Sequence, residues 1–139
     1  MMVLPIPQKI LVDSDAFISI RFLDQSTHSL ALKLFHKLQK QKAELYCINL
    51  CLYETATVIS RKYSQEHATN FYNDLKITSP TILNLDSTLE QQSWDLFLKQ
   101  TKKGTSFIDC ANLSALSYYN FDKIFSFDQF YPKQFRLFL

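Results

Sequence analysis

The chain has 139 residues, a length that suits a single hydrophobic core, so we expect one domain over residues 1–139. Its single glycine excludes the glycine-rich phosphate-binding loops of many nucleotide-binding proteins, because those loops need glycines at fixed offsets. The net charge of +2 is too small to predict nucleic-acid binding from bulk charge, so any polyanion has to be held by a local basic patch.

The three cysteines, Cys47, Cys51 and Cys110, lack C-x-x-C spacing and lie in apolar segments, which predicts buried, reduced thiols. No apolar run approaches the ~18 residues needed to span a bilayer. The opening residues MMVLPIPQK lack the charged-then-apolar order of a signal peptide. We therefore expect a cytoplasmic protein with no membrane association.

The first predicted strand is the apolar run at 10–12, and it is followed at once by two carboxylates, Asp13 and Asp15. Apolar residues then resume at helical spacing, which predicts a short helix or turn over 16–23. In open α/β sheets, ligands bind at the carboxyl ends of the strands. Asp13 therefore lies where a functional residue is expected.

The rest of the chain alternates between helices and strands, with polar caps and a few breaking residues at the boundaries. The predicted elements are a helix capped by Ser26, a strand over 44–48, a helix over 49–63, a helix capped by Ser64, a strand over 81–85, a helix with a Ser87/Glu90 capping box that stops near Gly104, a helix capped by Ser106, and a strand over 123–127. This alternation predicts a parallel sheet covered on both faces. The tail over 131–139 is expected to add an edge strand or to pack on the core.

Aromatic and aliphatic residues at helical spacing are expected to face the core, among them Tyr53, Tyr72 and Leu98. For four further aromatic residues, contact with a second copy or with a partner protein is an open alternative, and core packing is the favoured interpretation: Tyr46, Tyr118, Phe121 and Tyr131. Small residues in the helix after Ser106 indicate close packing near the centre of the sheet.

Four acids can meet at one edge of this sheet, since Asp13 and Asp128 follow strands while Glu54 and Asp109 lie near the starts of helices. Structural explanations remain open for two of them, because Glu54 can favour the helix dipole and Asp109 can belong to a capping box with Ser106. Two carboxylates ~4 Å apart repel by about 4 kcal/mol at an effective dielectric near 20. Because no Lys or Arg lies inside these motifs, a hard cation such as Mg²⁺ or Mn²⁺ is the expected partner.

Four short motifs in this order and spacing resemble those of PIN domains. They are I-L-V-D-S at 10–14, Y-E-T at 53–55, S-F-I-D-C-A at 106–111 and S-F-D-Q-F at 126–130. The resemblance implies a three-layer α/β/α fold with a central, mainly parallel sheet, and metal-dependent ribonuclease activity. Small stand-alone domains of this length resemble the toxins of VapBC toxin-antitoxin pairs. That likeness implies RNA as the substrate, an antitoxin as a partner and a homodimer as an oligomeric state to be tested.

Carried over to this chain, the family's acidic residues correspond to Asp13, Glu54, Asp109 and Asp128. The resemblance makes the three aspartates the Mg²⁺ or Mn²⁺ ligands and matches Ser14 to the family's small hydroxyl residue. Asp15 stands where the family often has Asn; it either joins the metal centre or caps the helix it begins, and we favour the cap. Ser126 either orients the neighbouring carboxylate or caps a turn.

The implied chemistry uses one or two ions to activate a water, to orient it in line with an RNA phosphodiester and to stabilise the leaving oxygen. Basic residues would hold the RNA backbone without reading its sequence. The candidates are Arg21, Lys33, Lys37, Arg61, Lys62 and Lys103. For the lysines near the middle of the second predicted helix, a solvated outer face is the favoured interpretation.

Two other functions remain open. The D-S-D sequence at 13–15 also matches the opening motif of haloacid-dehalogenase-like phosphatases, but the glycine-rich turn and the later motifs of that family are missing. A catalytically silent PIN-like domain that binds RNA or a protein is the other alternative. The presence of all four acids counts against it.

Overall fold

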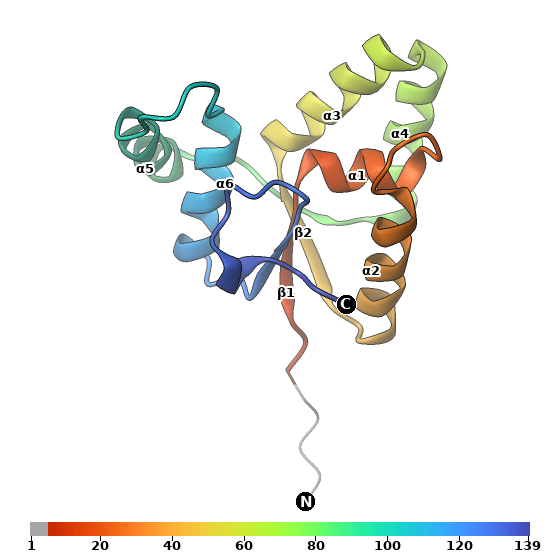
Figure 1. Ribbon diagram of the computed structural model, residues 1–139, viewed down its shortest axis with the longest axis horizontal. Helices are drawn as coiled ribbons and strands as arrows, with labels where there is room; N and C mark the ends of the chain where they lie inside the picture. The colour runs from red at the N-terminus through yellow and green to blue at the C-terminus, as the bar shows by residue number, and fades with distance from the viewer. Residues whose placement is uncertain (1–5) are drawn as a thin grey trace, which may run out of the picture.

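The structure is a computed structural model that describes residues 6–139 (Figure 1). The expectation of no signal peptide therefore falls partly on residues 1–5, which lie outside the described residues. Between residues 6 and 139, no helix combines the length and hydropathy required to cross a lipid bilayer.

Four parallel strands form one sheet in the order β3-β2-β1-β4. They are β1 (Lys9–Val12), β2 (Glu44–Ile48), β3 (Thr81–Leu83) and β4 (Lys123–Phe125). The chain adds β2 and β3 on one side of β1 and then crosses back to add β4 on the other side. The point where the strand order reverses, between β1 and β4, is where open α/β sheets form their ligand sites.

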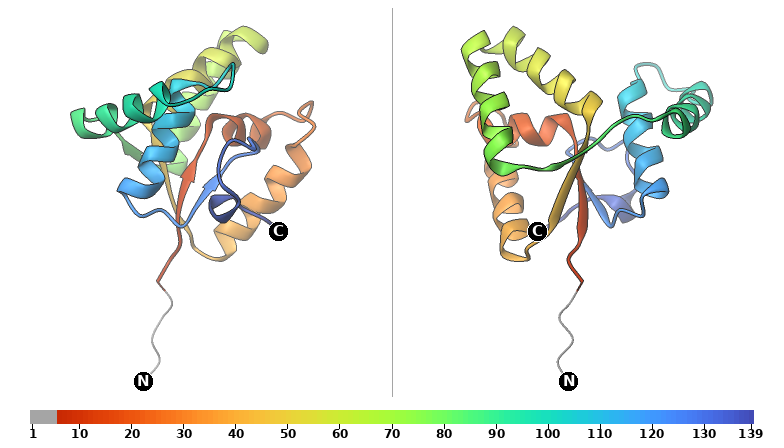
Figure 2. Two further views of the ribbon diagram at one scale, coloured as in Figure 1. Left: turned by 60° about the vertical axis from the view of Figure 1, so that its left-hand side comes forward. Right: turned by 180° about the vertical axis from the view of Figure 1, so that it is seen from behind.

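Six α-helices and one short 3-10 helix surround the sheet in the described part of the chain. They are α1 (Ser14–Arg21), α2 (His28–Lys40), α3 (Asn49–Lys62), α4 (Gln65–Thr78), α5 (Ser87–Leu98), α6 (Phe107–Tyr118) and η1 (Lys133–Phe135). The helices α5 and α6 lie on one side of the sheet, and α1, α2 and α4 lie on the other (Figures 1 and 2). This arrangement confirms the predicted three-layer α/β/α fold.

Each face of the sheet has its own hydrophobic core, and β1 contributes side chains to both. Successive residues of a strand point to opposite faces. Leu11 packs with α5 and α6, whereas Ile10 and Val12 pack with α1 and α2. All three side chains are buried. The apolar run that predicted the first strand therefore marks the central strand of the sheet.

Several helix caps follow the sequence prediction and two do not. The Ser64 and Ser106 hydroxyls accept hydrogen bonds from backbone N–H groups of α4 and α6, at 3.0 and 2.9 Å. The predicted Ser87 cap is wrong because Asp86, one residue earlier, accepts the Leu89 N–H at 2.8 Å and begins α5. The second helix begins after Thr27 rather than Ser26, without a side-chain cap.

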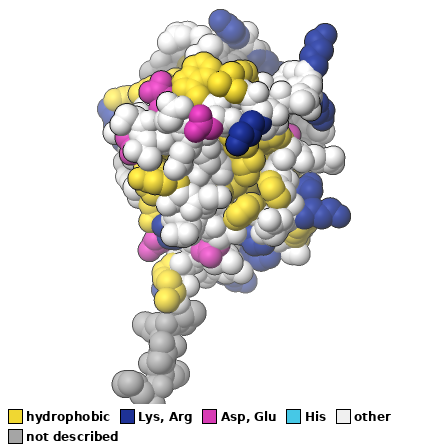
Figure 3. Space-filling view, turned by 90° about the vertical axis from the view of Figure 1, so that its left-hand side faces the viewer, with side chains coloured by type: hydrophobic (Ala, Val, Ile, Leu, Met, Phe, Trp, Pro, Cys, Tyr) yellow, Lys and Arg dark blue, Asp and Glu magenta, His cyan; other side chains and the backbone are white. Residues whose placement is uncertain are grey.

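The predicted core positions Tyr53, Tyr72 and Leu98 are wrong, since their side chains are 63%, 52% and 75% exposed. In α5, the buried residues are Leu89 and Ser93, which leaves Leu98 on the outer surface. Figure 3 shows the face of the molecule that lies on the α5 and α6 side, where hydrophobic and charged side chains are mixed. The small residues of α6 are buried as expected.

The strands β3 and β4 are each two residues shorter at their carboxyl ends than the sequence predicts. After β4, the backbone leaves the sheet because the Phe127 N–H donates to the Asp15 carboxylate rather than to a neighbouring strand. The tail adds one parallel bridge between Ile124 and Arg136, which is the remnant of the expected edge strand.

Candidate functional site

The carboxyl ends of β1 and β4 are tied together where the strand order reverses. The Asp13 N–H donates to the Phe125 carbonyl at 3.0 Å, so the residues that follow the two strands are held side by side. These residues are Asp13 after β1 and the segment 126–128 after β4. The predicted meeting of the first and last acidic motifs at one edge of the sheet is what this topology produces.

Asp13 is buried, and its carboxylate accepts five hydrogen bonds from the chain, the longest from the Cys51 thiol to Oδ1 at 3.8 Å. Oδ1 accepts from the Ser14 N–H at 2.8 Å and from Asn112 Nδ2 at 3.1 Å. Oδ2 accepts from the Ser126 and Tyr131 hydroxyls, both at 3.0 Å. Burial raises the pKa of Asp13, and these donors offset part of that effect. Hydrogen bonds to both oxygens thus fix the orientation of the Asp13 carboxylate.

Asp109, in the first turn of α6, lies next to Asp13 through Tyr131. Its Oδ1 is 3.4 Å from the Tyr131 hydroxyl, which also contacts Asp13. Burial raises the pKa of Asp109 to about 6, with the charges of Asp13 and Asp128 as further causes. Although Ser106 caps α6, the Asp109 carboxylate points to Tyr131 and Asp13.

Glu54 reaches the same edge from α3. The Ser14 hydroxyl donates to Glu54 Oε2 at 2.6 Å and lies 3.3 Å from the Cys51 carbonyl. Ser14 therefore joins the start of α1 to α3 and connects Glu54 to its neighbour Asp13. This is the supporting position that the sequence resemblance implies for Ser14.

Asp15 does not cap α1, because the N-cap residue of that helix is Asp13. Asp15 Oδ2 instead accepts from the Phe127 N–H at 2.8 Å and lies 3.3 Å from the Ser126 hydroxyl. Burial, and to a smaller extent the charge of Asp13, raise the pKa of Asp15 to about 7. Its other oxygen, Oδ1, is buried without a hydrogen-bond partner.

Asp128 is held in a turn after β4. Its N–H donates to the Ser126 hydroxyl at 3.1 Å, and its Oδ1 accepts the Phe130 N–H at 2.9 Å. Of the two alternatives left open for Ser126, the turn cap is observed, whereas the carboxylates that its hydroxyl contacts are those of Asp13 and Asp15 rather than that of Asp128.

Within residues 6–139, no salt bridge neutralises the acids of the site, Asp13, Asp15, Glu54, Asp109 and Asp128. Across residues 6–139, the one ion pair joins Arg21 to Asp74, away from these acids. The donor set consists of oxygens, and Asp15 Oδ1 is unpartnered, so the residues fit a hard divalent cation in type and in charge. In the same range, no three acidic, His or Cys side chains converge closely enough to enclose an ion.

One predicted RNA-binding residue shares a cavity with two of the acids, and another lies on the same helix face as Glu54. Lys103, with Lys102, lines a surface cavity of about 440 Å³ whose other residues include Asp109 and Asp128. Arg61 follows Glu54 by seven residues, which places both on one face of α3, roughly 10 Å apart along the axis. Lys62 is exposed in the last turn of the same helix.

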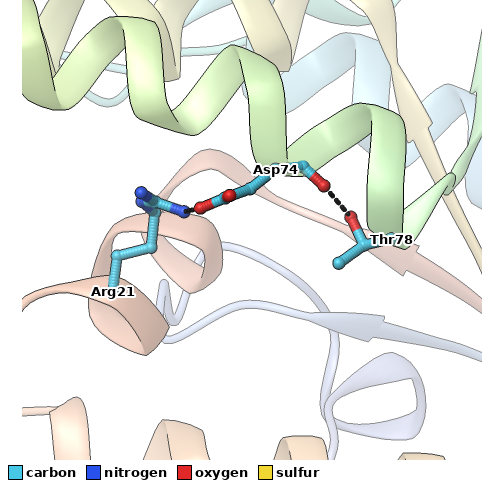
Figure 4. A network of polar contacts seen from close by, with 3 residues as sticks. All are labelled: Arg21, Asp74 and Thr78. Carbon is cyan, nitrogen blue, oxygen red and sulfur yellow. Dashed lines mark hydrogen bonds and ion pairs between the residues drawn. The ribbon is translucent and has the colours of Figure 1, made fainter.

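The structure does not bring the other predicted basic residues to the acids. The Arg21 guanidinium donates to Asp74 of α4 at 2.6 Å (Figure 4). Lys37 donates to the Phe138 carbonyl at 2.9 Å and lines a cavity with Gln8, at the opposite end of the strands. Lys33 precedes Lys37 by one turn of α2.

Sequence reasoning missed Asn112 and Tyr131, which hold the Asp13 carboxylate. For Tyr131 the favoured prediction of core packing is confirmed, since its side chain is 1% exposed, but its contact with Asp13 was not foreseen. The available signal was spacing: Asn112 follows Asp109 by three residues in an otherwise apolar helix, which places both on one face. The predicted buried, unpaired cysteines are confirmed for all three positions.

The comparisons with known proteins agree with this geometry. The structure is similar to that of VapC20 from Mycobacterium tuberculosis, described as a sarcin-ricin loop cleaving toxin, with a TM-score of 0.76 and 18% sequence identity over 86% of this chain and 89% of that chain. At this identity, the likeness concerns the fold. No curated protein sequence matches the chain. The model of the PIN domain family matches residues 10–133, a range that includes all four acidic motifs. The chain therefore belongs to the PIN domain family.

Proposed function

We propose that the protein is a metal-dependent endoribonuclease that hydrolyses RNA phosphodiester bonds, and that it acts in the cytoplasm as the toxin of a toxin-antitoxin pair. The observation that carries this proposal is the gathering of the family's four acids, without a cationic partner, at the reversal point of a PIN sheet. The likeness to VapC20, a sarcin-ricin loop cleaving toxin, supports the toxin assignment.

In this proposal, Asp13, Asp109 and Asp128 hold Mg²⁺ or Mn²⁺, and Glu54 completes the acidic set. The ion would supply a Lewis acid for the phosphodiester and for the attacking water. Ser14 keeps the Glu54 carboxylate in place through the hydrogen bond at 2.6 Å.

The RNA backbone would be held on both sides of the acids. Lys103, from the loop between α5 and α6, lines the cavity that Asp109 and Asp128 also line. Arg61 lies on the same face of α3 as Glu54. Contacts of this kind add affinity without sequence selectivity, so they place the substrate but leave the choice of target to other features.

The test is incubation of the purified protein with a mixed cellular RNA pool in Mg²⁺, Mn²⁺ or EDTA. Asp13→Asn and Asp109→Asn are expected to abolish metal-dependent cleavage, because each removes charge without removing volume. Asp95→Asn, on the exposed side of α5, is the matched control and should cut as the wild type does. Cleavage at the wild-type rate by Asp13→Asn would overturn the assignment of the site.

Membership of the PIN domain family rules out a haloacid-dehalogenase-like phosphatase, but a silent PIN domain needs a separate measurement. A silent domain would bind RNA equally well in Mn²⁺ and EDTA and would leave the RNA intact. Calorimetric titration with Mn²⁺ then separates the two, since a silent scaffold need not take up the ion.

The proposed partner is an antitoxin protein that covers the acids. Co-expression with the neighbouring reading frame of the source genome, followed by affinity purification, tests this proposal. Light scattering of the isolated protein tests the homodimer.

A further inference from the structure

The hydrogen bonds on Asp13 raise a question about how this carboxylate takes a cation, and the answer rests on the proposed function. Each carboxylate oxygen has two lone-pair positions. On Asp13, the Ser14 N–H and Asn112 occupy those of Oδ1, where the Cys51 thiol also lies at 3.8 Å, and the Ser126 and Tyr131 hydroxyls occupy those of Oδ2. A cation can be accepted only where one of these donors leaves.

The two donors on Oδ1 are fixed. The Ser14 N–H belongs to the backbone at the start of α1. The Asn112 amide is held by three partners at once, because Nδ2 also lies 3.4 Å from Cys51 Sγ and 3.1 Å from the Tyr131 hydroxyl. Neither donor has a second carboxylate to which it can turn.

The two donors on Oδ2 are hydroxyl groups, and each has a second carboxylate within reach. The Tyr131 hydroxyl lies 3.0 Å from Asp13 Oδ2 and 3.4 Å from Asp109 Oδ1. The Ser126 hydroxyl lies 3.0 Å from Asp13 Oδ2 and 3.3 Å from Asp15 Oδ2. A hydroxyl has one proton, so rotation about its C–O bond moves the donated bond without moving the side chain.

We propose that Tyr131 and Ser126 are hydroxyl switches that cap Asp13 Oδ2 in the metal-free protein and turn to Asp109 and Asp15 when a divalent cation binds. Asp13 Oδ2 is then free to act as a ligand, while Oδ1 stays fixed by Ser14 and Asn112. Tyr131 and Ser126 are positioning residues in this arrangement. The switch also gives Asp15 a role, since its carboxylate accepts the hydrogen bond that the Ser126 hydroxyl donates after it turns.

The proposal predicts an unusual effect for Tyr131→Phe. The variant lacks the Tyr131 hydroxyl in the metal-free and in the metal-loaded protein. The hydrogen bond that the metal-free protein loses, to Asp13 at 3.0 Å, is shorter than the distance to Asp109, at 3.4 Å. The variant therefore loses more in the metal-free state than in the loaded state. We expect Mn²⁺ to bind about three- to tenfold more tightly, from the usual strength of hydrogen bonds to charged groups. A residue that merely supports the metal ligands would have the opposite effect.

The test is calorimetric titration of the full chain with Mn²⁺, together with thermal unfolding in EDTA. Tyr131→Phe and Ser126→Ala should each bind Mn²⁺ more tightly than the wild type and unfold at a lower temperature in EDTA. Tyr46→Phe is the matched control, because its hydroxyl donates to the Glu44 carboxylate at 3.0 Å at the start of β2. Its Mn²⁺ affinity should equal that of the wild type.

Each outcome decides a separate point. Weaker or unchanged Mn²⁺ binding by the Tyr131 and Ser126 variants overturns the switch and leaves the proposed nuclease standing. If Tyr131→Phe does not fold, the Ser126→Ala titration decides alone. A wild-type protein that binds no Mn²⁺ overturns the metal centre itself, and with it both the switch and the proposed function.

Discussion

Replacing Asp15 by Asn should stabilise the metal-free protein at neutral and alkaline pH. Burial raises the pKa of this carboxyl from 3.8 to about 7, so the folded protein resists its ionisation. A raised pKa contributes stability below the unfolded value, and that stability is lost as the pH rises through the folded value. For these two pKa values, the cost of the acid is roughly 2 kcal/mol at pH 5 and roughly 4 kcal/mol at pH 8. Asn has nearly the same volume, and its carbonyl can still accept the Phe127 N–H.

The assay is urea-induced unfolding of the wild type and of Asp15→Asn in EDTA at pH 5 and pH 8. The difference in the free energy of unfolding should favour the variant and should grow by about 2 kcal/mol between the two pH values. Asp95→Asn, an exposed acid on α5, should leave the free energy unchanged at both. The reasoning fails if Asp15→Asn is less stable than the wild type at pH 8, since the carboxylate would then be a net stabilising group.

Further predictions concern the acids and the basic residues around them. Saturating Mn²⁺, at about 100 times its Kd, should stabilise the wild type by about 2.7 kcal/mol, measured by thermal unfolding with and without EDTA. Cleavage at subsaturating Mn²⁺ should fall as the pH drops through about 6, because a proton on Asp109 then competes with the cation for the carboxylate, and a pH–rate profile checks this. Lys103→Ala should raise KM with little effect on kcat and reduce the salt dependence of binding, whereas Lys37→Ala should change neither in the same steady-state assay. Arg21→Ala should cost less than about 1 kcal/mol in urea unfolding, because its partner Asp74 is half exposed, and cleavage should be unchanged.

The fold was predictable because its evidence is local. Apolar runs give the strands, 3.6-residue periodicity gives the helices, and their alternation gives a parallel sheet. Strand ends were less predictable. The apolar pattern continues through Phe127, but Asp15, more than a hundred residues earlier in the chain, takes the Phe127 N–H and ends the pairing.

The acids of the site were predictable from motifs, whereas the groups that hold them were not. Asn112 and Tyr131 reach Asp13 across 99 and 118 positions, and no local pattern marks such contacts. Arg21 shows the opposite error. It follows the first acidic motif closely in sequence, but α1 carries it away from the strand ends and toward α4.

The D-S-D sequence at 13–15 illustrates why a short motif does not decide a function. The same residues suit the nucleophile and the general acid of a phosphatase. Here, however, Asp13 caps α1, and Asp15 accepts a hydrogen bond from the Phe127 N–H after β4. The family match then assigns the motif to a PIN domain.

The order in which the site residues are made has a consequence for synthesis of the protein. Asp13 emerges from the ribosome early, and β1 can pair with β2 soon afterward. The other side of β1 has to wait for β4, and the Asp13 carboxylate has to wait for Ser126 and Tyr131, which come 113 and 118 positions later. A nascent chain in which this segment is still inside the ribosome lacks the Ser126 and Tyr131 hydroxyls on Asp13 and also lacks Asp128 at the site. For an enzyme whose proposed substrate is RNA, this order delays assembly of the centre until residues 126–131 have left the ribosome.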